Sequence, residues 1–185
     1  GTAGLRPSAW SWGIGFGVAF FGQALRIYTV GHVPRRTSGR STRHQVAESL
    51  NTTGIYSVLR HPLYVGNSLI WLGISLFFGD WRLSFIITLL ALLYHERIAM
   101  AEEAFLESKF GDDYRQWTQR TPACLPHFGG WQPPALGFCW RTAVAREYRG
   151  VAGIAWVSAV AVALTHWAAG RALAPGQGGR LGTGR

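Results

Sequence analysis

The sequence predicts an all-α fold: a polytopic membrane helical bundle with about four transmembrane helices. Of the 185 residues, 48% are hydrophobic and only 15% are charged. Four windows contain no Asp, Glu, Lys or Arg: residues 7–25, 61–79, 83–95 and 150–170. A spanning helix needs about 20 mostly apolar residues. The alternative, a soluble bundle with unusually buried helices, fits these window lengths less well. The same composition excludes a disordered chain.

The first and last windows are long enough to span a bilayer by themselves. The second and third windows are separated by a short turn at residues 79–82, so we expect them to form a helical hairpin. The third span is expected to continue into the polar residues 94–97. We predict one membrane domain over residues 1–173, and a disordered tail over the Gly-rich residues 174–185.

The basic residues predict the orientation of the spans. The formal net charge is +9, and Arg dominates the loop 31–60 and the segment 97–149. The positive-inside rule therefore places both segments in the cytoplasm. Basic nucleic-acid-binding domains usually carry more Lys and fewer long apolar runs, so we expect no nucleic-acid partner. We expect a multi-pass integral membrane protein, in the inner membrane if the host is bacterial.

The few acidic residues are concentrated after the third window. Six of the nine acidic residues fall within residues 96–113. On a helix that continues from the third span, Glu96, Glu103 and Glu107 share one face and Glu102 lies beside it. Ionisable groups at the end of a span are candidates for function. The alternative is a solvated amphipathic helix on the membrane surface.

A second polar cluster precedes the second window. Pro62 suits the first turn of a helix and disfavours the helical conformation at His61. Arg60 and His61 therefore flank a helix N-terminus whose first N–H groups are unpaired, which is the arrangement of an anion site.

Small and aromatic residues surround this helix start. Gly54 and Gly66 allow a ligand to approach the backbone closely, and Tyr56 and Tyr64 offer aromatic faces to a cation. The alternative is that Arg60 and Tyr64 only mark the membrane interface, where both residue types are common.

Three motifs in this order resemble the isoprenylcysteine carboxyl methyltransferase family. They are Tyr56-x-x-x-Arg60-His61-Pro62-x-Tyr64-x-Gly66, then Glu102-Glu103-x-x-Leu106-x-x-x-Phe110-Gly111-x-x-Tyr114-x-x-Trp117, then Arg120-Thr121-Pro122. The resemblance covers roughly residues 50–126. It implies an integral-membrane methyltransferase that uses S-adenosylmethionine, related to the phospholipid N-methyltransferases, with a cofactor pocket on the cytoplasmic side.

The resemblance and the two clusters together assign roles to particular residues. The cofactor-binding set is Tyr56, Arg60, His61, Pro62, Tyr64, Gly66, Asn67, His95, Glu102, Glu103 and Leu106. The catalytic set is Arg60, His95 and Arg97. The substrate-binding set is Arg97, Tyr114 and Arg120. We expect no metal, because the His and Glu spacing is not that of a zinc-binding His-Glu-x-x-His helix.

These residue types suit S-adenosylmethionine. Arg or His binds a carboxylate and Glu accepts from hydroxyls or an ammonium, while Tyr faces tolerate a sulfonium. We expect direct in-line methyl transfer to an oxygen or nitrogen of a lipid or lipidated acceptor. An anionic head group fits the Arg-rich loop better than an amine, for which His95 would be the base.

Three other interpretations remain open at this stage. One is a membrane reductase of a related group that uses a nicotinamide cofactor, and another is a non-catalytic membrane scaffold. A third is a metal enzyme using His61, His95, Glu96 and His127. The eukaryotic family members also have more spans, and the loop 31–53 is not part of the motif. The prenylcysteine acceptor is therefore not carried over. Arg35, Arg36, Arg40 and Arg43 in that loop are candidates to recognise a different acceptor.

Overall fold

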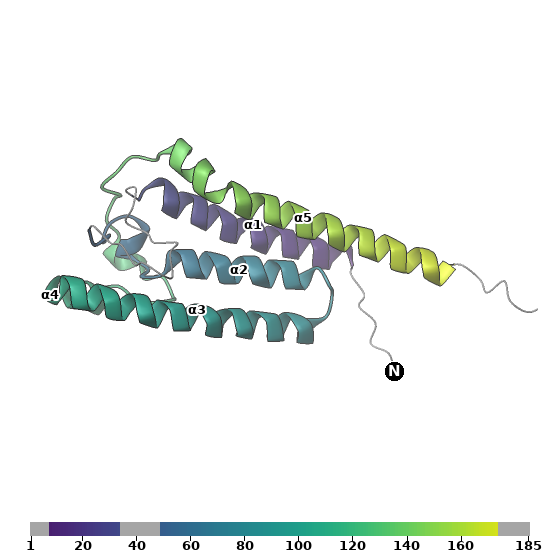
Figure 1. Cartoon of the computed structure of the whole chain (residues 1–185), viewed down its shortest axis with the longest axis horizontal. Coiled ribbons are helices and arrows are strands. Elements are labelled where there is room, and N and C mark those ends of the chain that lie inside the picture. The colour runs from purple at the N-terminus through teal and green to yellow at the C-terminus, as the bar shows by residue number, and fades with distance from the viewer. Residues whose placement is uncertain (1–7, 34–48, 174–185) are drawn as a thin grey trace, which may run out of the picture.

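The structure is a computed structural model that describes residues 8–33 and 49–173. It is a bundle of long helices, with α4 and the connection from α4 to α5 at one end and the short turn between α2 and α3 at the other (Figure 1). The elements in chain order are α1 (Ala9–Gly31), η1 (Ile55–Ser57), α2 (Pro62–Leu76), α3 (Trp81–Phe110), α4 (Asp112–Arg120), η2 (Phe128–Gly130) and α5 (Trp140–Leu173). The predicted all-α fold is confirmed.

Three helices are long and apolar enough to cross a membrane. These segments are Trp10–Gly31, Trp81–Phe110 and Trp140–Leu164. The second predicted span corresponds to α2, which has 15 residues. At 1.5 Å per residue it is about 22 Å long, shorter than the roughly 30 Å hydrocarbon core. The count of four spans therefore stays a prediction.

The third and fourth predicted spans are longer than their uncharged windows. α3 begins after Asp80, whose side chain accepts hydrogen bonds from the backbone N–H groups of Arg82 and Leu83. It continues to Phe110, so Glu96, Glu102, Glu103 and Glu107 lie on the same helix as the third span, as predicted, whereas Asp112 and Asp113 begin α4. α5 begins at Trp140 rather than at residue 150. The first turns of α5 lie outside the uncharged window 150–170 because they contain charged residues. The Arg residues at 35, 36, 40 and 43 and the tail 174–185 lie outside the described residues.

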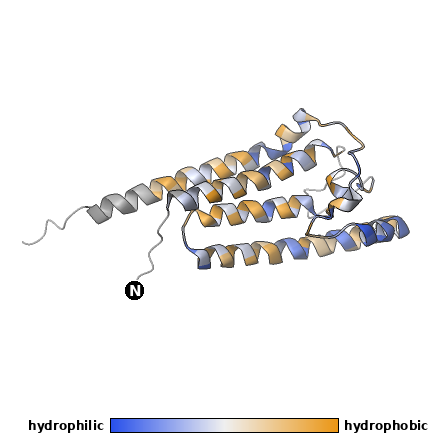
Figure 2. Ribbon diagram, turned by 180° about the vertical axis from the view of Figure 1, so that it is seen from behind, coloured by the Kyte–Doolittle hydropathy of each residue, from blue (hydrophilic) through white to orange (hydrophobic). Residues whose placement is uncertain are grey.

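Hydropathy separates the two ends of the bundle. Figure 2 shows strongly hydrophilic residues along α4 and the adjoining end of α3, whereas hydrophobic residues dominate the rest of the helices. Large apolar side chains such as Leu90 on α3 and Trp156 on α5 are exposed. Outward-facing apolar side chains on helices of spanning length are typical of lipid contact. The chain is therefore an integral membrane protein.

Glycines bring α1 and α2 into close contact. A Cβ atom added at Gly73 would lie 2.5 Å from the Ala19 nitrogen and 2.5 Å from the Gly15 oxygen. One added at Gly22 would lie 2.6 Å from the Gly66 oxygen. Small residues let membrane helices approach until their backbones touch, and this contact fixes the position of α2 against α1.

We expect Gly73→Ala to lower the thermal unfolding temperature of the detergent-solubilised protein. The added methyl group meets backbone atoms that cannot move aside, and overpacking of this kind costs about 1–3 kcal/mol. Gly17→Ala is the matched control, because Gly17 lies on α1 with nothing within 4 Å of its added Cβ. Helix propensity makes that substitution neutral or stabilising. Equal unfolding temperatures for the two variants would contradict the close helix contact.

Candidate active site

The site begins where the chain enters α2. His61 is the N-cap of that helix and Pro62 occupies its first turn, as the sequence predicts. The Arg60 backbone N–H donates to the Pro122 carbonyl over 2.9 Å, so the residues before α2 are held by the chain that follows α4. This contact fixes the direction in which the Arg60 and His61 side chains leave the backbone.

The paired glutamates of α3 contact this helix start directly. Glu103 Oε1 lies 3.0 Å from Arg60 Nη1 and 2.6 Å from His61 Nε2. Glu102 Oε2 accepts a hydrogen bond of 2.7 Å from the Tyr64 hydroxyl. The two clusters that the sequence predicts as parts of one site are thus joined by charge-assisted contacts, which are among the stronger polar interactions in proteins.

Three rings extend the site from α2 to the middle of α3. The His61 and Tyr64 rings are stacked with centroids 5.5 Å apart, and the Tyr64 and His95 rings are stacked with centroids 5.7 Å apart. His95 is buried, and its Nδ1 lies 3.1 Å from the Ser68 hydroxyl. His95 therefore contacts the cluster through the Tyr64 ring. It lies about two helix turns before Glu102 and Glu103 on α3.

Two buried polar atoms at the site have no hydrogen-bond partner among the described residues. They are Nε of Arg60 and the hydroxyl of Tyr114, a residue of α4 that is only 4% exposed. Most buried polar groups in proteins are hydrogen-bonded, so this pair is suited to bind a ligand. Burial raises the pKa of Tyr114 to about 12, the negative charge of Glu103 adds to the effect, and the Arg60 guanidinium opposes it.

This shift predicts how stability depends on pH. The ordinary phenol pKa is 10.0 and that of folded Tyr114 is about 12. Between these values the folded chain keeps a proton that the unfolded chain loses, so the free energy of unfolding falls as the pH rises. We expect Tyr114→Phe to show a smaller fall over this window in thermal unfolding curves. Identical pH profiles for the variant and the wild type would contradict the shift.

Tyr56 lies at the edge of the same cluster. Its backbone carbonyl accepts a 2.9 Å hydrogen bond from the Trp117 indole, which ties η1 to α4. Burial is the main cause of a raised pKa at Tyr56, and the negative charge of Glu102 raises this pKa further. The phenol is thus neutral and close enough to Glu102 to sense its charge.

Other predicted site residues lie elsewhere on the same helices. Gly66 faces α1, where an added Cβ would lie 2.6 Å from Cγ of Arg26. Asn67 Oδ1 accepts a 2.6 Å hydrogen bond from the same arginine. Leu106 is half-buried, whereas Arg97 and Arg120 are exposed. The assigned roles of these residues stay predictions.

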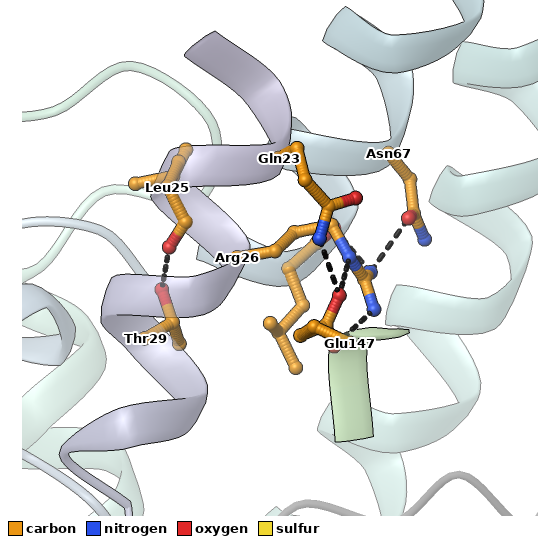
Figure 3. A network of polar contacts seen from close by, with 7 residues as sticks. Gln23, Leu25, Arg26, Thr29, Asn67 and Glu147 are labelled. Atoms are coloured by element: carbon orange, nitrogen blue, oxygen red, sulfur yellow. Dashed lines mark hydrogen bonds and ion pairs between the residues drawn. The ribbon is translucent and has the colours of Figure 1, made fainter. Parts of the chain in front are cut away.

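A buried ionic network lies behind the site and joins α1, α2 and α5 (Figure 3). Arg26 binds Glu147 through two contacts, Nε to Oε2 over 2.9 Å and Nη2 to Oε1 over 2.8 Å. Gln23 Nε2 donates to the same carboxylate over 3.0 Å. Glu147 is 2% exposed. This network is not among the predicted features, although an Arg near the end of one apolar segment and a Glu near the start of another are the residues from which it could have been predicted.

Comparison with known proteins identifies the family. The family model for phospholipid methyltransferases matches residues 13–113, which is more than half of the chain. The chain belongs to this family. The matched region runs from α1 through α3 and includes Arg60, His61 and the two glutamates. It ends at the start of α4 and leaves out α5.

Individual relatives agree with the predicted resemblance. The chain is 34% identical over 95 residues to a protein-S-isoprenylcysteine O-methyltransferase of Schizosaccharomyces pombe, covering 48% of this chain and 40% of that protein. It is 29% identical over 114 residues to the cobalt-zinc-cadmium resistance protein CzcN of Cupriavidus metallidurans, covering 62% and 51%.

A solved structure is also similar. The eukaryotic intramembrane Ras methyltransferase, an isoprenylcysteine carboxyl methyltransferase, superimposes with a TM-score of 0.51 at 25% identity. The likeness covers 66% of this chain and 44% of that one. The chain thus spans about half the length of these proteins or less. The predicted resemblance to the isoprenylcysteine carboxyl methyltransferases is confirmed.

Proposed function

We propose that this protein is a membrane-embedded methyltransferase that takes its methyl group from S-adenosylmethionine and transfers it to a lipid or lipidated acceptor. The observation that carries the proposal is the contact of Glu103 with both Arg60 and His61. This contact brings the start of α2, which is suited to bind an anion, next to the carboxylate pair of α3. Both lie at one end of the helical bundle. The names of the isoprenylcysteine methyltransferase relatives support the reaction class.

The residues at the site suit each part of the donor. Arg60 Nε and the Tyr114 hydroxyl are buried and unpaired among the described residues, so both can donate to a carboxylate. The Glu102 carboxylate can accept from ribose hydroxyls or an ammonium. The stacked rings of His61, Tyr64 and His95 offer aromatic surface to a cation. The bound donor supplies an electrophilic methyl group on a sulfonium centre.

The chain's own contribution to the reaction would be mainly positioning and exclusion of water. Holding two reactants in the correct relative orientation can lower the activation barrier by about 7–11 kcal/mol. Arg97 is exposed on α3, and we assign it to an anionic acceptor head group. Tyr114 and Arg120 would cover the site from α4. His95 would act as a base only if the acceptor is an amine, which must lose a proton.

The acceptor would reach the site from the bilayer. Carboxylate, phosphate and amine head groups all fit the proposal, and the isoprenylcysteine named for the relatives is one such lipidated group. The Arg-rich connections favour an anionic head group and support a site on the cytoplasmic side. In a bacterial host that membrane would be the inner one.

Calorimetry on the full chain in detergent tests the donor. We expect heat of binding with S-adenosylmethionine and with its demethylated product. Membrane extracts supplied with methyl-labelled donor should then yield a labelled lipid or lipidated product in the presence of the protein. No binding of either compound would overturn the proposal. Binding of a nicotinamide dinucleotide instead would favour a reductase.

A further inference from the structure

The connection between α4 and α5 has an unusual surface. Residues 121–140, which we call the apolar segment, contain no Asp, Glu, Lys or Arg and lie between Arg120 and Arg141. Five large side chains of this segment are 44–81% exposed: Leu125, Phe128, Trp131, Leu136 and Trp140. A protein surrounded only by water rarely exposes so many large apolar side chains in one short segment, so something other than water is expected to cover them.

The backbone of the apolar segment is fixed to the protein while these side chains point away. Backbone hydrogen bonds attach it to the residues before α2 and to the end of α1. They are Arg60 N to Pro122 O (2.9 Å), His127 N to Val58 O (3.0 Å), Gly54 N to Gln132 O (3.0 Å) and Cys139 N to Gly31 O (2.8 Å). These bonds satisfy part of the backbone, and the remaining polar groups require water or lipid head groups, which the interfacial layer offers and the hydrocarbon core does not.

The attachment points set the level of the apolar segment relative to the bilayer. The α1 span ends at Gly31 and the α5 span begins at Trp140. The Cys139–Gly31 hydrogen bond and the Phe138 ring packed on Gly31 place the end of the segment beside both span ends. Those spans have 22 and 25 residues. At 1.5 Å per residue they are about 33 and 38 Å long, slightly more than the roughly 30 Å hydrocarbon core.

We propose that the apolar segment lies in the lipid head-group layer at the same end of the bundle as the candidate site. Its exposed rings and leucines insert among the lipids, where Trp is enriched, and Arg120 and Arg141 face the phosphates. The same segment holds the backbone before α2. Contact with the bilayer therefore keeps Arg60 and His61 at the membrane boundary. This proposal does not depend on the identity of the methyl donor.

Lipid quenching of a fluorescent label tests the proposal. Leu125→Cys and Phe128→Cys are made in a Cys124→Ser, Cys139→Ser background and labelled with an environment-sensitive fluorophore. Native Cys124, which is exposed, is labelled in a Cys139→Ser variant as a second measurement that leaves the apolar side chains intact. The full chain is placed in nanodiscs of phosphatidylcholine with and without brominated acyl chains. We expect blue-shifted emission and a loss of intensity with brominated lipid at all three positions.

Gln116→Cys is the matched control, because Gln116 is exposed on the polar helix α4 at the same end of the bundle. Its label is expected to emit as in water and to be unaffected by bromine. The proposal is overturned if labels at 124, 125 and 128 behave like the label at 116. It is equally overturned if they are blue-shifted without quenching, since protein rather than lipid would then cover the segment.

Discussion

The Glu103→Gln variant will bind S-adenosylmethionine about ten- to hundred-fold more weakly than the wild type. Glu103 contacts both Arg60 and His61 through the same oxygen. Removing its charge leaves the Arg60 guanidinium unpaired and changes the direction in which both side chains point. Hydrogen bonds to charged groups contribute about 1.5–3 kcal/mol each, and the expected loss corresponds to one of them. Isothermal titration of the detergent-solubilised protein measures it.

Glu107→Gln is the matched control for this measurement. Glu107 lies one turn further along α3, is half exposed, and pairs with Arg115 on the surface. We expect its dissociation constant to equal that of the wild type. A Glu102→Ala, Glu103→Ala double variant should bind no more tightly than Glu103→Gln. Wild-type affinity in the double variant, with an unchanged unfolding temperature, would show that the donor site is elsewhere in the protein.

Glu147→Ala will destabilise the protein by about 3–5 kcal/mol, the cost of removing one partner of a buried ion pair. The side chains of Arg26 and Glu147 are 12% and 2% exposed. Without the carboxylate, the guanidinium stays between apolar helices, and its remaining acceptors among residues 8–33 and 49–173 are Asn67 Oδ1 and the Leu63 carbonyl. Thermal unfolding in detergent, or proteolysis of the opened state, measures the loss.

Two further variants separate charge pairing from simple damage to the fold. Glu107→Ala breaks the exposed pair with Arg115 and is expected to change stability by at most about 1 kcal/mol. The double variant Arg26→Met, Glu147→Leu replaces the buried ions with apolar side chains. We expect it to be more stable than Glu147→Ala alone, since such replacements are often neutral or stabilising. A Glu147→Ala loss no larger than that of Glu107→Ala would contradict the buried network.

The membrane character and the core of the site follow from local patterns that a sequence displays. Uncharged windows predict spanning helices because a helix that crosses the hydrocarbon core must consist mostly of apolar residues. Pro62 predicts the start of α2 because its ring fits only a first turn. The acids of α3 are recognisable because they cluster at the end of a span. Their contact with Arg60 and His61 follows once α2 and α3 pack as a hairpin.

The parts that the sequence did not predict depend on contacts between distant residues. Arg26 and Glu147 are 121 positions apart. Arg26 ends the first uncharged window and Glu147 lies three residues before the fourth, but neither position reveals its partner. Gly66 packs closely against Gly22 and Arg26 of α1. The sequence did not predict this contact, because it depends on how α1 and α2 pack together. The unpaired Tyr114 hydroxyl likewise becomes visible only when α4 folds back beside Arg60.

The Arg26–Glu147 pair also has a consequence for the order of membrane insertion. α1 is made first and enters the bilayer with a guanidinium near its end, at a cost of up to about 2.5–3.5 kcal/mol for an arginine at mid-membrane. Its carboxylate partner lies in α5, which leaves the ribosome last among these helices. The family core from α1 to α3 therefore lacks the carboxylate partner of Arg26 until α5 is made. α5, although outside the matched region, completes the assembly.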